Sequence, residues 1–226
     1  MQNTNTAPAV GRQIKRYLFL ILLIVLSASF QTLGMKADIG VCALWDSVSL
    51  NVYELTGLKV GTFTIIANCI LVLLQLIILR KNFHPRRLLQ VPAAICFGLV
   101  TNFVYYRILV FDLGSYPVRL MCYMISCVGL ALWAGGHTYL NLVQMPPEGF
   151  CYVVNKKYGI SFSKLRMLQD FTCIIISLLL SLLFGLSLKV REGTVIGMLL
   201  LGPIMGFFME HFWKGRIEPE PFEKDS

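Results

Sequence analysis

Long apolar stretches alternate with short polar segments along the whole chain. Each stretch has about the ~20 residues that an α-helix needs to cross a hydrocarbon core of ~30 Å. The pattern predicts six membrane helices, over residues 17–34, 60–79, 88–106, 118–136, 165–188 and 194–213. The sequence therefore predicts an all-α, polytopic membrane protein.

The first apolar stretch follows Arg12, Lys15 and Arg16, as the apolar region of a secretory signal would. However, it is long, residues 35–38 form a poor cleavage site, and five further stretches follow. Composition agrees with a membrane helix here, because a chain that is 56% hydrophobic and 14% charged has more apolar surface than a water-soluble fold can bury.

Basic residues are unevenly distributed between the two sides of the predicted bundle. With the N-terminus inside, fourteen of the 20 Lys and Arg residues fall in cytoplasmic segments and six on the opposite side. Segments rich in Lys and Arg stay in the cytoplasm. We therefore expect both termini to be cytoplasmic and the protein to lie in the bacterial cytoplasmic membrane.

The two halves of the sequence share a pattern of similar residues at a fixed spacing. When the sequence is shifted by 102 residues, similar residues coincide: Gly34 with Gly136, Asp46 with Glu148, Gly57 with Gly159 and Asn68 with Asp170. A slightly larger shift places Gly98 on Gly202. We assign residues 17–106 to the first three-span unit, 118–213 to the second and 107–117 to the connecting loop, with 1–16 and 214–226 as cytoplasmic terminal segments.

Because three spans are an odd number, the second unit must enter the membrane from the opposite side, which makes the units inverted repeats. Secondary transporters with inverted repeats bind their solutes near the midplane, where interrupted helices meet. The candidates for interrupted helices are two short segments, 46–56 and 148–158, which are too short to span. They either re-enter the membrane or lie along its surface.

Both short segments have residues typical of helix ends. Asp46 and the Pro-Pro-Glu run ending at Glu148 suit a first turn, and Gly57 and Gly159 suit C-terminal caps. The two carboxylates are either simple caps, or they approach each other at the pseudo-axis and hold a cation, a proton or a polar ligand.

Polar residues within apolar stretches are further candidates, because they are costly in lipid. Asn68 and Asp170 occupy equivalent positions, and Arg191, Glu192 and Thr194 enter the sixth stretch, where Arg191 could pair with a membrane carboxylate. The remaining amides in the spans, Gln75, Gln90 and Asn102, are expected to hydrogen-bond between helices.

Several runs together resemble the YczE/YitT group of bacterial integral membrane proteins: GTFTIIANCILVLLQLIILRKNF, LLQVPAAICFG, PPEGF, YGISFSKLRMLQD and VREGTVIGMLLLGPI. The resemblance implies a multi-pass protein of the cytoplasmic membrane. It also implies that Pro147–Gly149, Asp170 and Arg191–Thr194 are elements of that group. The chain departs from the group at Ala43, where Pro is common, and at Asn102, where an acidic residue is common.

Two functions fit these features. The first is a transporter or exporter of a small solute or ion, and the alternative is an accessory protein that binds another membrane or biosynthetic protein, or a second copy of itself. We expect neither an enzyme nor a cofactor, because no nucleotide-binding, GxSxG or HExxH motif occurs. Scattered Cys and His residues give no metal spacing, no basic stripe suits nucleic acid, and the acidic tail from Glu218 to Asp225 is expected to be disordered.

Overall fold

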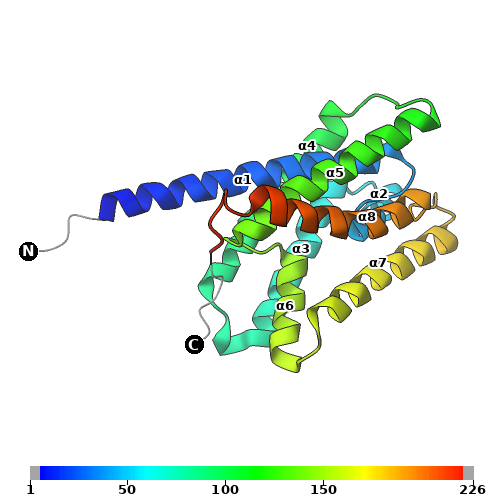
Figure 1. Ribbon diagram of the computed structural model, residues 1–226. Coiled ribbons are helices and arrows are strands. Elements are labelled where there is room, and N and C mark those ends of the chain that lie inside the picture. The colour runs from blue at the N-terminus through cyan, green and yellow to red at the C-terminus, as the bar shows by residue number, and fades with distance from the viewer. Residues whose placement is uncertain (1–5, 221–226) are drawn as a thin grey trace, which may run out of the picture.

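The computed structural model describes residues 6–220, with the side chains of residues 6–10 excepted. Over this range the chain is helical and has no strand (Figure 1). The helices in chain order are α1 Thr6–Ala37, α2 Leu44–Thr56, α3 Val60–Leu79, η1 Arg80–Asn82, η2 Pro85–Leu89, α4 Gln90–Phe103, η3 Val104–Ile108, α5 Tyr116–Leu140, α6 Pro146–Tyr158, α7 Phe162–Phe184, α8 Glu192–Phe208 and η4 Met209–Trp213.

Six helical segments of the described chain are long and apolar enough to cross a membrane: Gly11–Ala37, Val60–Asn82, Pro85–Ile108, Tyr116–Leu140, Phe162–Phe184 and Glu192–Trp213. The prediction of an all-α, multi-pass membrane protein is confirmed. Most boundaries differ from the predicted ones by a few residues, at most six, and the fifth span ends at Phe184 rather than at residue 188. Gly185 ends it there by adopting φ 65°, a left-handed conformation that favours glycine, and its N–H donates to Ser181 O.

Both ends of the described chain lie at the same end of the bundle, which is called the terminal end below (Figure 1). The C-terminal tail is docked there as far as Glu220. Arg16 donates to Glu218 O (2.6 Å) and pairs with the Glu220 carboxylate (2.8 Å), while Glu220 N donates to Leu140 O (3.1 Å). The expectation of a disordered tail is wrong for these residues, because ionic and backbone contacts fix them. Its remainder, 221–226, lies outside the described residues.

The centre of the bundle is the long contact between α1 and α5, the first helices of the two three-span units that the sequence predicts. Small residues permit this close approach. A Cβ added at Gly34 would lie 2.5 Å from Ser126 Oγ, and one added at Gly129 would lie 2.1 Å from the Phe30 ring. On the same interface, a Cβ at Gly136 would lie 3.1 Å from the Leu23 side chain. Gly34 thus faces α5, whereas Gly136 lies between Trp213, 2.8 Å from an added Cβ, and Leu23 of α1.

The short helices are exchanged between the units, since α2 packs on α7 and α6 packs on α3. A hydrogen bond between side chain and backbone stabilises each of these two helix contacts. Asn51 Nδ2 donates to the Ser177 carbonyl oxygen (2.8 Å), and Gln75 Nε2 donates to the Pro146 carbonyl oxygen (3.3 Å). Gln75 and Ser177 are 102 positions apart, so corresponding turns of α3 and α7 receive the opposite unit's short helix.

The last helices of the two units end alike but pack differently. Both α4 and α8 pass into a short π-helical turn, η3 and η4. However, α4 packs closely along α3, whereas α8 packs on α5 and hardly touches α7. Figure 1 shows α7 diverging from α8 along the side of the bundle.

Candidate functional site

Both short helices begin two residues earlier than predicted, at Leu44 and Pro146. The N-cap positions are Ala43 and Met145, and neither makes a side-chain capping bond. Asp46 and Glu148 are therefore not N-caps, but each lies in the first turn of its helix, as its sequence position predicts. The predicted C-terminal caps are confirmed, since Gly57 and Gly159 have φ values of 73° and 71°.

The two short helices are oriented alike with respect to the protein interior. In α2 the residues from Asp46 to Asn51 are buried, whereas the last turn is exposed. In α6 the buried positions lie between Pro146 and Val153, and the last turn is again exposed. Each helix therefore points its N-terminal end, where free N–H groups and the positive end of the dipole lie, into the bundle.

Asp46 is a buried carboxylate with a neutral partner. Its side chain is 1% exposed, and Gln31 Nε2 donates to its Oδ1 at 2.7 Å. Its second oxygen, Oδ2, is buried and accepts no hydrogen bond from the described residues. Burial raises the pKa of Asp46 well above its ordinary value, and the bond from Gln31 only partly opposes this rise. The group is therefore poised to take up a proton or a cation.

Glu148 lies in a different, charged environment on α6. Arg166 of α7 donates to Glu148 Oε1 at 2.7 Å and also approaches Asp170 Oδ2 at 3.8 Å. Glu148 Oε2 is buried and without a partner among the described residues. The sequence analysis does not single out Arg166, although its i,i+4 spacing from Asp170 indicates that these two side chains can pair.

Gly149 follows this carboxylate and allows α6 to approach an amide pair. Gln75 Nε2 donates to Gln90 Oε1 at 2.9 Å, and a Cβ at Gly149 would lie 2.7 Å from Gln90 Nε2. Asn102 likewise joins α4 to α3 by accepting from Gly61 N at 2.8 Å. The predicted hydrogen bonding of these amides between helices is confirmed.

Asn68, the repeat partner of Asp170, is a buried amide in α3. Its side chain is 3% exposed, and its Oδ1 has no hydrogen-bond donor among the residues that the structure describes. The first unit therefore has a neutral group at the position where the second unit has a carboxylate paired with Arg166.

The three predicted residues at the start of α8 lie apart, at the end of the bundle opposite the termini. Thr194 Oγ1 accepts from Arg191 N and from Val41 N, both at 3.2 Å. Arg191 donates to Asp38 O (2.9 Å) and pairs with its neighbour Glu192 (3.2 Å). These contacts fasten the loop after α1 to the start of α8. The cation that pairs with the carboxylates Glu148 and Asp170 is Arg166 rather than Arg191.

The predicted residues thus form two acceptor sites and one structural clasp. Asp46 accepts a hydrogen bond from Gln31, whereas Glu148 and Asp170 share the cation Arg166. Asp46 and Glu148 each keep one buried oxygen that accepts no bond from the described residues. Such oxygens suit a cation, a proton or a ligand with N–H groups. In the part of the chain that the structure describes, no three His, Cys, Asp or Glu side chains gather as metal ligands would.

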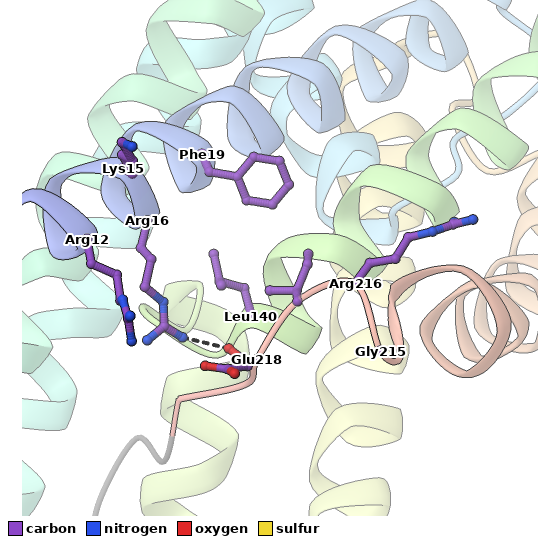
Figure 2. Close-up of a pocket in the computed structure, with 9 residues that line it drawn as sticks. Arg12, Lys15, Arg16, Phe19, Leu140, Gly215, Arg216 and Glu218 are labelled. Carbon is purple, nitrogen blue, oxygen red and sulfur yellow. Dashed lines mark hydrogen bonds between the residues drawn. The ribbon is translucent and has the colours of Figure 1, made fainter.

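Two cavities open at opposite ends of the bundle. The larger, of about 780 Å³, lies at the terminal end between α1 and the C-terminal tail (Figure 2). The smaller, of about 340 Å³, lies at the other end beside Lys36 and Tyr105. Neither cavity is lined by Asp46, Glu148 or Asp170.

Comparison with known protein families gives a match over most of the chain. Residues 14–210 match the model of a family described as a family of unknown function, DUF6198. No curated protein and no solved structure matches the chain significantly.

Proposed function

Because the chain belongs to DUF6198, a family of unknown function, its activity has to be inferred from its own residues, and we propose that it is a secondary transporter of a small solute or ion. Transport would use inverted repeats that move relative to each other around sites at the short helices. On this proposal the protein lies in the bacterial cytoplasmic membrane with both termini inside, as its basic residues indicate, and carries out no enzymatic reaction. We also propose that the protein is related to the YczE/YitT group, which its sequence resembles.

The observation that carries the proposal is the pair of short helices. Each has 13 residues, or about 20 Å at about 1.5 Å per residue, which is too short to cross the membrane. Each enters the bundle by its N-terminal end and brings a carboxylate with one buried, unpartnered oxygen. Half-helices that meet a polar site in this way are typical of secondary transporters with inverted repeats.

The reciprocal packing supports an inverted repeat. The short helix of each unit packs on the second long helix of the other, and the first long helices pack on each other. A two-fold axis between α1 and α5 would relate these contacts. The same axis would give the protein two equivalent conformations, one open to each side of the membrane, as alternating access requires.

The chemistry of the sites favours a solute that carries positive charge or N–H groups. Asp46 and Glu148 offer acceptor oxygens, and each is already stabilised by only one donor side chain among the described residues. Proton coupling is compatible with the same residues, since a buried carboxylate that loses its proton must gain a cation to remain buried.

The proposal is tested by a thermal-stability screen of the detergent-purified protein against small cations, amines and amino acids across pH. A ligand that binds only the folded state at 100 times its Kd adds ~2.7 kcal/mol. We expect a stabilising compound whose effect is lost in Asp46→Asn or Glu148→Gln but kept in Glu192→Gln, a control carboxylate whose side chain is 44% exposed. The same compound should then be taken up by proteoliposomes.

Equal stabilisation of all three variants, or no uptake of a compound that binds, would contradict transport through these sites.

A specific observation favours the alternative of an accessory protein. Only 17% and 6% of the most apolar stretches of the α7 and α8 spans are buried, so the second unit exposes a wide apolar surface. If a membrane protein copurified at fixed stoichiometry and covered these helices, the accessory function would be the better assignment.

A further inference from the structure

The larger cavity is walled by charged groups on one side and apolar groups on the other. Arg12, Lys15 and Arg16 project from successive turns of α1, and Figure 2 shows the two arginine side chains descending side by side toward the tail. Phe19 and Leu140 supply apolar surface, and residues 215–218 of the tail close the remaining side.

The basic groups of this cavity are not all satisfied by the protein. Arg16 is held by Glu218 O and by the Glu220 carboxylate. Arg216 turns away, donating to Phe212 O and lying over the Phe212 ring. Within residues 6–220, Arg12 and Lys15 have no ion-pair or hydrogen-bond partner. Two of the four cations that line the cavity therefore have no partner within residues 6–220, and Glu218 is the one acidic residue among those lining it.

An exposed apolar stripe begins next to these cations. Leu18 and Leu22 follow Lys15 by three and seven residues, a spacing that places all three on one face of α1. The two leucines are 61% and 50% exposed and lie within the first membrane span. The basic cavity thus continues directly into a surface that faces the hydrocarbon region.

We propose that this cavity binds the phosphate headgroup of an anionic phospholipid, whose acyl chain lies along Leu18 and Leu22. Free phosphate esters share the headgroup chemistry, but they have no use for the apolar stripe. The headgroup would lie at the depth of Arg12 and Lys15, at the membrane–water interface, where clustered basic residues attract anionic lipids. Because residues 215–218 wall the cavity, the bound lipid would also contact the tail, which follows η4 and is held to α1 by Arg16.

The test measures binding of fluorescent phosphatidylglycerol to the full-length, detergent-purified protein. We expect the double variant Arg12→Gln/Lys15→Gln to bind it about tenfold or more weakly, and the affinity of the wild type to fall with added salt. The matched control, Lys81→Gln/Lys164→Gln, removes the same charge from exposed positions that do not line the cavity. Both variants leave Arg16 and its tail contacts intact, and their melting temperatures without lipid verify folding.

Three outcomes would overturn the proposal. Equal affinity of the two double variants would show that net charge, rather than the cavity, attracts the lipid. Equal binding of zwitterionic phosphatidylcholine would remove the need for an anion. Competition by glycerol 3-phosphate at the concentration of the lipid would identify a free phosphate ester as the occupant. Retained lipid specificity that is lost only in Arg12→Gln/Lys15→Gln would support the site.

Discussion

The two predicted three-span units differ in how their last two helices pack. In the first unit a Cβ at Gly98 would lie 2.5 Å from Gly61 O and 2.4 Å from the Ile65 side chain, so α3 and α4 touch backbone to backbone. In the second unit the corresponding Gly202 would meet no described atom within 4 Å. The same residue type therefore has a packing role in one unit and none in the other.

This difference leaves the units unequally tied to the protein. The most apolar stretches of the spans built on α3 and α4 are 28% and 39% buried, against 17% and 6% for those of α7 and α8. Local stability follows buried contacts. If the units move relative to each other, we expect α3 and α4 to move as one body, and α7 and α8 to supply the larger displacements.

The largest expected effect comes from the glycines themselves. Gly98→Ala should lower the unfolding free energy by ~1–3 kcal/mol, because overpacking at a backbone contact forces the helices apart. Gly202→Ala should be neutral or slightly stabilising, since alanine favours a helix by up to ~1 kcal/mol over glycine. Thermal unfolding in detergent measures both. Equal losses would mean that Gly202 is packed and that the units are alike.

The next effect compares the carboxylates of the two short helices and begins with Asp46. Its raised pKa means that the folded state holds its proton to a higher pH than the unfolded state does, so stability should fall as pH rises above ~4. Asp46→Asn should remove this slope, match the wild type in acid and exceed it at neutral pH by ~1–3 kcal/mol. Melting curves across pH would contradict the prediction if the variant kept the slope or lost stability at pH 7.

At Glu148, the carboxylate of the other short helix, we expect the opposite sign: removing its partner Arg166 should lower the stability of the folded protein. Arg166→Gln leaves Glu148 and Asp170 without their shared cation and should destabilise the protein by ~1 kcal/mol, a small value because the Arg166 side chain is 40% exposed and screened by solvent. The triple variant Glu148→Gln/Arg166→Gln/Asp170→Asn should recover much of this loss. If Arg166→Gln alone had no effect, the three charges would not be coupled.

The smallest effect concerns the exposed ends of the short helices. Glu54 at the end of α2 pairs with Lys189 (2.7 Å) and accepts from Ser187 N, and these partners lower the pKa of Glu54 to about 2. Its contribution to stability is present above the unfolded pKa of about 4.5 and is lost as pH falls toward 2. Glu54→Gln should therefore melt slightly lower than the wild type at pH 6, by less than ~1 kcal/mol, and the two curves should converge in acid. A difference that persisted in acid would come from packing instead.

The spans and the order of the short helices were predictable because apolar length and glycine caps are local signals. Gly57 and Gly159 ended their helices as expected, since only local φ is required. The partners of the site residues were not predictable, because they come from other elements. Nothing near Glu148 in the sequence indicates that Arg166 of the next helix will reach it, or that Asp46 will have only the amide of Gln31. The unequal packing of Gly98 and Gly202 was hidden for the same reason.

The exchange of short helices between the units has a consequence for biosynthesis. Asn51 and its partner Ser177 are separated by 126 residues, so at ~5–20 residues per second α2 leaves the ribosome roughly 6–25 s before the helix that receives it. During that interval Asp46 and Asn51 have no α7 to bury them, and we expect the insertion machinery to retain α2 until then. Nascent chains that stop before α7 should consequently be recognised and degraded as unassembled.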